Sequence, residues 1–198
     1  MSELVAASSL KEFFKVLLED AIARQRVSLG EVTEFYLVNL LSEFAASEKL
    51  FAEEWGGRKD HEPLAILYAR ALNQDREQRI RTLRRLGDVS LYKVGFFSDS
   101  LREGVVGPDY YIQMGGAAYG QVASLSPSNG FGGVYQELHD KFRALVEVLE
   151  EISARGMVAN GAAGTMKVFE SWSRSGSEHL EKVLVEAGVV VPKSGLAN

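Results

Sequence analysis

The 198-residue sequence contains no cysteine. Disulfides, zinc sites built on thiolates, cysteine-ligated iron–sulfur clusters and thiol nucleophiles are therefore excluded. Long apolar runs are absent too, since no stretch approaches the roughly 18 uninterrupted apolar residues that a membrane-spanning helix needs. Charged residues interrupt the first twenty positions, unlike the start of a signal peptide. We expect a cytoplasmic protein that does not engage a membrane.

Histidine is scarce, and its three positions lack metal-binding spacing. None of them completes a Glu-x-x-His pair, because the residues three places earlier are Arg58, Gln136 and Gly176. Di-iron sites in helical bundles use two such pairs. The Gly-x-Ser-x-Gly motif of hydrolases is also missing. We expect no catalytic residue set, no metal and no cofactor; a haem-like group on one histidine is a weaker alternative.

Basic residues are outnumbered, with 22 Lys and Arg against 27 Asp and Glu, for a net charge of −5. Nucleic-acid binding is driven largely by Lys and Arg contacts to phosphates. The acidic balance therefore argues against a nucleic-acid partner.

Apolar residues recur at helical spacing through nearly all of the chain. Leu10, Phe13, Phe14, Leu17 and Leu18 are an example near the start. Strand-like alternation and internal repeats are missing. The pattern predicts an all-α fold, a single-domain bundle of about eight helices over residues 1–198, with a tail from about residue 188. A division in the Gly- and Ser-rich loop 124–133 is the alternative.

Capping residues predict several helix ends. Ser8 or Ser9 suits the first helix, and Ser28 with Glu31 forms a capping box for the second. A helix from about Asp75 is expected to stop at Gly87, with a new one following.

Two later boundaries are predicted by the same reasoning. Asp109 is the expected cap of the next helix. Gly176 interrupts the last helix, from about Thr165 to Ala187, and Ser177 can cap the helical segment after the break.

The stretch YYIQMGGAAYGQVA, residues 110–123, is crowded with small residues. Gly115 and Gly120 have the spacing of a phosphate-binding loop, but Gln121 and Val122 replace the Lys and Ser or Thr that such a loop needs. We therefore predict a helix whose small residues let another helix pack closely against it, with Gly116 and Gly120 as an interaction surface. A ligand lying against the bare backbone is the alternative.

Five arginines lie within ten residues: Arg76, Arg79, Arg81, Arg84 and Arg85. They form a local basic patch that could receive a phosphate, a carboxylate or an acidic partner. The alternative is a solvated helix face paired with its own acidic neighbours.

Aromatic and polar residues at helical spacing suggest a pocket, with core packing as the alternative. The candidate lining residues are Tyr36, Asn39, Phe96, Asp99, Tyr111 and Met114.

These patterns suggest two functions. The first is a non-enzymatic binding or regulatory protein that acts through contact with a protein partner or with itself, as a homodimer. The second is a protein that binds a small molecule or a haem-like cofactor in an aromatic-lined pocket, as a sensor or a cofactor-free enzyme.

Overall fold

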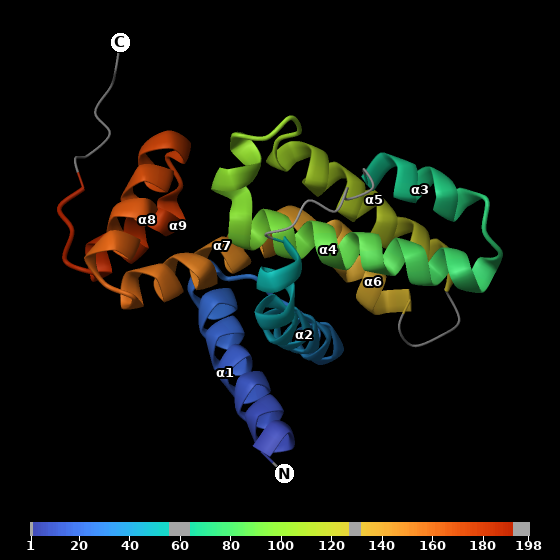
Figure 1. Ribbon diagram of the computed structural model, residues 1–198, viewed down its shortest axis with the longest axis horizontal. Coiled ribbons are helices and arrows are strands. Elements are labelled where there is room, and N and C mark those ends of the chain that lie inside the picture. The colour runs from blue at the N-terminus through green and yellow to red at the C-terminus, as the bar shows by residue number, and fades with distance from the viewer. Residues whose placement is uncertain (1, 56–63, 127–131, 192–198) are drawn as a thin grey trace.

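The computed structural model describes residues 2–55, 64–126 and 132–191, with the backbone alone for residues 2–8 and 47–55. Nine helices and no strand occur in these ranges, which confirms the all-α prediction (Figure 1). The helices are α1 (Ser2–Gln25), α2 (Glu31–Trp55), α3 (Leu64–Leu72), α4 (Arg76–Arg102), α5 (Pro108–Leu125), α6 (Gly132–Asp140), α7 (Phe142–Ala159), α8 (Ala162–Ser175) and α9 (Glu178–Glu186).

The long helix α4 lies at the centre of the bundle, against α5, α7 and α3. A first apolar cluster has members in every helix from α1 through α7, with Leu86, Tyr119 and Leu149 among its buried residues. A second, smaller cluster joins the end of α7 to α8 and α9 through Ala154, Val168 and neighbouring residues. Figure 1 shows α7 continuing from the main bundle to the α8–α9 pair. α7 therefore connects the two clusters.

Glycines allow the central helices to approach closely. The stretch 110–123 lies within α5, and a Cβ placed on Gly115 would lie 2.7 Å from the Ser90 Cβ of α4. A Cβ on Gly87 would lie 2.5 Å from the Tyr119 ring. The prediction that a helix stops at Gly87 is wrong, because this glycine makes room for a tyrosine inside a continuous α4.

Three predicted caps also differ from the structure. Helix α1 begins at Ser2, before both Ser8 and Ser9. The N-cap of α5 is Gly107, so Asp109 lies in the first turn instead. Helix α2 begins at Glu31, one residue after Gly30, whose carbonyl accepts from the amides of Thr33 and Glu34.

The start of α2 is stabilised by a distant carboxylate rather than by the predicted capping box. Glu137 of α6 accepts from the Gly30 amide at 3.1 Å and from the Thr33 hydroxyl at 2.5 Å. Lys141 also donates to this carboxylate, at 2.8 Å. A carboxylate at a helix N-terminus is favourable because free amides and the helix dipole both attract negative charge.

Other boundaries agree with the sequence. The Asp75 side chain accepts from the Gln78 amide at 2.9 Å at the start of α4. Gly176, with φ of 65°, ends α8 in the left-handed conformation that glycine adopts readily, and Ser177 caps α9. Of the predicted loop 124–133, residues 127–131 lie outside the described ranges, and so do residues 192–198 of the predicted tail.

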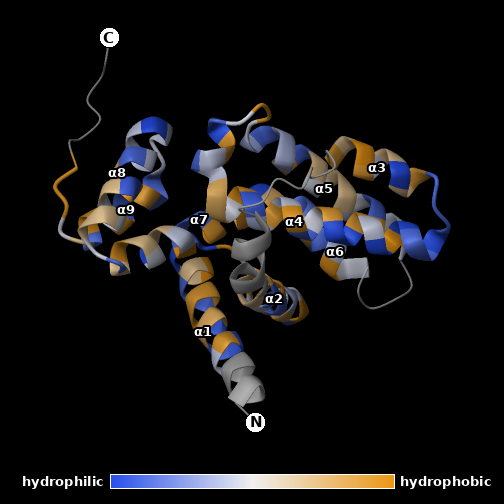
Figure 2. Ribbon diagram, in the orientation of Figure 1, coloured by the Kyte–Doolittle hydropathy of each residue, from blue (hydrophilic) through white to orange (hydrophobic). Residues whose placement is uncertain are grey.

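Figure 2 shows polar residues interspersed with apolar ones along the helices. Across the described ranges, no helix combines the length and apolar character needed to cross a membrane.

Candidate ligand cleft

A cleft of about 890 Å³ opens beside α7, between the two apolar clusters. Its walls come from α1, the C-terminal end of α4, the second half of α7, and α8. Leu180 of α9 also lines the cleft, which lies where α8 and α9 pack on the end of α7.

A kink in α4 shapes one wall. Phe97 has φ of −131° and ψ of 26°, outside the helical region, so the last turn of α4 leaves the axis of the rest. Phe96 and Phe97 line the cleft at this point, and Phe13 of α1 lines it as well. Phe13 is 57% exposed and Phe97 is 40% exposed, so both rings offer apolar surface to an incoming molecule.

The opposite wall depends on the turn between α7 and α8. Gly161 has φ of 99°, a conformation that side chains other than glycine rarely adopt. Gly164 then lies so near the Met157 carbonyl that a Cβ would overlap the oxygen. In contrast, Gly156 has open space around the position of a Cβ. Both Gly156 and Gly164 line the cleft, so this wall is tightly packed at Gly164 and open at Gly156.

Charged groups at the mouth are paired across the cleft. Asp99 of α4 accepts a hydrogen bond from Ser171 and lies 3.6 Å from the Arg174 guanidinium, both residues of α8. Arg174 also lies 3.6 Å from Glu103. These contacts link the kinked end of α4 to α8. Lys167 and Glu170 line the same mouth from exposed positions.

Glu150 of α7 lines the cleft in a different electrostatic state. Burial raises the pKa of its carboxyl above the ordinary value, while a hydrogen bond with Ser98 and the charge of Arg102 oppose that shift without cancelling it. Within the described ranges this carboxyl has no ion-pair partner within 4.0 Å. Its burial is therefore only partly compensated.

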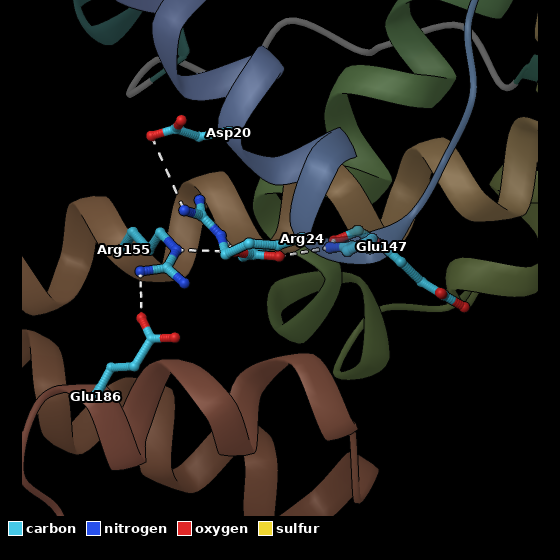
Figure 3. Close-up of polar contacts among 7 residues, drawn as sticks. Asp20, Arg24, Glu147, Arg155 and Glu186 are labelled. Carbon is cyan, nitrogen blue, oxygen red and sulfur yellow. Dashed lines mark hydrogen bonds and ion pairs between the residues drawn. The ribbon is translucent and has the colours of Figure 1, made fainter.

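The next residue, Glu151, belongs to a closed polar network, of which Figure 3 labels Arg24, Arg155 and Glu186. Glu151 is 3% exposed, and its carboxylate accepts from Arg24 at 2.6 Å, Gln25 at 2.7 Å and Arg155 at 2.8 Å. Burial acts to raise the pKa of Glu151, but these hydrogen bonds outweigh it and hold the pKa below its ordinary value. The network joins α1 to α7, and Arg155 extends it to Glu186 of α9 at 2.8 Å.

A second closed cluster lies inside the main bundle. Oδ1 of Asp88 accepts from the hydroxyls of Tyr36 at 2.5 Å and Tyr119 at 2.8 Å. Burial raises the pKa of Asp88, and burial together with this carboxylate raises the pKa of both tyrosines. The Arg84 guanidinium contacts Tyr135, whose ring packs at 5.6 Å from that of Tyr36. The cluster joins α2, α4, α5 and α6.

The structure places the six predicted pocket residues in different surroundings. Only Phe96 and Asp99 line the cleft. Tyr36 belongs to the Asp88 cluster, and Asn39 donates to the Phe35 carbonyl of its own helix at 2.7 Å. The ring of Tyr111 lies beneath the Lys93 ammonium at 5.8 Å. Met114 packs against the first apolar cluster.

Four of the five predicted surface arginines contact other helices, and Arg81 pairs with Glu77 of its own helix. Arg79 donates to the Ala71 carbonyl at 3.2 Å and Arg76 to the Leu125 carbonyl at 2.5 Å, at the ends of α3 and α5. Arg84 contacts Tyr135 in the Asp88 cluster. Arg81 lies 3.6 Å from Glu77, and Arg85 lies 3.8 Å from Glu43 and 5.0 Å above the Phe44 ring.

Gly116 and Gly120, the other predicted surface residues, face His139 of α6. The His139 Nδ1 lies 2.7 Å from the Gly116 carbonyl oxygen. A Cβ on Gly120 would lie 3.0 Å from the same nitrogen.

Sequence reasoning missed Phe13, Glu150 and Arg174 as cleft residues. One signal was available for Phe13, because adjacent helical residues point about 100° apart and one of two neighbouring phenylalanines can therefore lie at the edge of the buried face. Phe14 is buried and Phe13 is exposed accordingly. The sequence gives no such signal for Glu150. Its place in the cleft depends on which side of α7 packs against α1 and which side lines the cleft.

No group of three or more potential metal ligands among His, Asp and Glu comes together in the described part of the chain. No protein-family model matches the sequence, and the searches of curated proteins and of solved structures find no match either.

Proposed function

We propose that this protein binds a small amphipathic molecule in the cleft between α1, α4, α7 and α8. The observation that carries the proposal is a cavity of about 890 Å³ with exposed aromatic walls and a paired, charged mouth. Ligand sites in proteins commonly measure roughly 300–1,000 Å³ and combine apolar walls with a few polar groups. The proposal is for binding and involves no chemical step.

Exposed apolar surface within the cleft supplies the driving force. Burying apolar area is worth about 25 cal/mol for each Å² removed from water. The rings of Phe13 and Phe97 would each lose water contact against an occupant. The pairs that Asp99 and Arg174 form at the mouth hold the two walls at this spacing before a ligand arrives, which reduces the entropic cost of binding.

Blocking the cleft tests the proposal. Gly156→Trp introduces a bulky ring at a position that lines the cleft and has open space around a Cβ. With the neutral fluorescent probe N-phenylnaphthylamine, we expect this variant to lose at least about tenfold in affinity, because the indole takes the volume of the ligand.

Two control variants accompany the test. Gly133→Trp places the same side chain on α6, where the space is equally open but lies outside the cleft, and Gly156→Ala leaves the cleft free. Both should bind the probe like the parent protein. Equal binding by the parent and Gly156→Trp, or no probe binding to the parent, would contradict the proposed function.

Contact with a second copy of the chain is the other candidate, favoured by apolar residues on α2. Val32 is 53% exposed and Phe35 is 68% exposed, and they lie one turn apart on the same helix. Solution mass tests this candidate: it predicts a dimer that Phe35→Ser dissociates, whereas a strict monomer would contradict it.

A further inference from the structure

We propose that the preferred ligand of the cleft is an organic cation, an amine or ammonium group attached to an apolar body, with its charge received by Glu150. This inference rests on the proposed function and names the chemical class of its ligand. Three observations carry it: the surroundings of Glu150, the state of the other charges in the cleft, and the nature of the walls.

A bound cation would compensate the partly buried carboxyl of Glu150. Glu150 is partly buried in the cleft wall and hydrogen-bonds Ser98. The charge of Arg102 also acts on it, but no ion pair within 4.0 Å forms in the described ranges, so its burial stays only partly compensated. Removing a carboxylate from water is costly unless an opposite charge or sufficient hydrogen bonds compensate. A bound ammonium would supply that charge, so its attraction to Glu150 would offset a desolvation cost that the folded protein already bears.

The cationic side chains of the cleft offer less to an anion. Arg174 already lies against Asp99 and Glu103. Lys167 is exposed at the mouth and stays hydrated, so an anion there would gain only the small energy of a surface pair. Charge complementarity therefore favours a positive ligand at the depth of Glu150.

The aromatic walls favour the same class. Phe13, Phe14, Phe96 and Phe97 all line the cleft. A cation over a ring face is attracted by the negative electrostatic potential of the ring, and ammonium ligands are commonly bound between aromatic side chains. An apolar body attached to the cation would bury against the same rings.

A matched set of three probes tests the inference: phenylbutylammonium, phenylbutanol and phenylbutyrate, which share an apolar body and differ in charge. At neutral pH, titration calorimetry should give the ammonium an affinity about tenfold above that of the alcohol, with the carboxylate weakest. Glu150→Gln should remove the difference in affinity between the ammonium and the alcohol. Its affinity for the alcohol should stay like that of the parent protein. Glu77→Gln, with the same change of charge at the far end of α4 and outside the cleft, should leave the ranking unchanged.

The possible failures are distinguishable. Equal binding of the three probes, or an advantage of the ammonium that survives Glu150→Gln, overturns the inference and leaves the cleft as a binding site. Tighter binding of the carboxylate overturns it in favour of an anionic ligand. Binding of all three that Gly156→Trp does not weaken overturns the inference and the proposed function together.

Discussion

Glu150 and Glu151 are adjacent on α7 and have opposite electrostatic surroundings. Glu151 faces α1 and α9, where two arginines and a glutamine surround its carboxylate and lower its pKa. Glu150 lines the cleft, where burial raises its pKa and Ser98 together with the charge of Arg102 compensates only in part. The difference shows that one side of α7 is a closed junction that holds helices together, whereas the other lines an open cleft, where we propose that a ligand binds.

The Asp88 cluster is a second closed junction, and it should produce the largest response to pH. The folded-state pKa values of Tyr36 and Tyr119 are raised, so their contribution to stability is complete below the ordinary tyrosine pKa of 10.0 and is lost as pH rises above it. Each of these tyrosines should reduce the free energy of unfolding by up to about 1.4 kcal/mol for every pH unit above that value.

Alkaline titration followed by tyrosinate absorbance and circular dichroism measures this effect. We expect these tyrosines to ionise only as the helices unfold. Their ionisation in the intact fold, before any loss of helix, would contradict the buried cluster.

Removing the charge of Glu151 should give the next largest effect. Glu151→Gln leaves Arg24 and Arg155 facing a neutral amide in a buried junction. Breaking a buried ion pair by removing one partner costs about 3–5 kcal/mol, and we expect the lower end, about 3 kcal/mol, because both arginines retain some exposure. Denaturant unfolding of the variant and the parent measures the difference.

The acid response gives an independent check of the same junction. Because the pKa of Glu151 is lowered on folding, its stabilisation is present above the ordinary carboxyl value of 4.5 and is lost as pH falls through the folded-state pKa. Glu151→Gln should therefore lose less stability than the parent on acidification. Identical acid dependence in the two proteins would show that Glu151 has no such role.

A pair of glycine substitutions compares a tightly packed position of the cleft wall, Gly164, with an open one, Gly156. Gly164→Ala forces a Cβ against the Met157 carbonyl and should cost about 1–3 kcal/mol, because the backbone of α8 must move. Gly156→Ala should stabilise by up to about 1 kcal/mol, since alanine favours the helix and no atom obstructs it. Thermal unfolding measures both; a neutral Gly164→Ala would contradict the close α7–α8 contact.

The smallest effect is expected at Glu150. Glu150→Gln should leave stability unchanged or slightly increased, because the amide removes an incompletely compensated charge and can keep its hydrogen bond with Ser98. Denaturant unfolding of the Glu150→Gln variant, the Glu151→Gln variant and the parent protein compares the two losses of stability directly. A loss as large as that of Glu151→Gln would show that Glu150 is also a closed, structural carboxylate.

The fold could be predicted from the sequence because apolar spacing and capping residues are local signals. Asp75 and Ser177 cap the expected helices. Gly87 misled the prediction because the sequence does not show that Tyr119 will pack against it. Likewise, the start of α2 depends on Glu137, more than a hundred residues away.

The site was harder to predict for the same reason. Phe96 and Asp99 line the cleft, but the rest of its lining comes from α1, α7 and α8, which meet only in the folded protein. In the sequence, Glu150 and Glu151 are two adjacent glutamates that nothing distinguishes. Only the arrangement of α1, α4 and α8 around α7 places Glu151 in a junction between helices and makes Glu150 a candidate ligand contact.

Carboxyl-carbon NMR titration of Glu150 and Glu151, with and without phenylbutylammonium, tests the central claim most directly. We predict that Glu150 titrates above the ordinary glutamate value in the free protein and moves downward when the ammonium binds, because the bound cation favours the charged carboxylate. Glu151 should titrate below the ordinary value in both conditions. Two similar free-state pKa values, or a Glu150 titration that the ammonium leaves unchanged, would contradict the account.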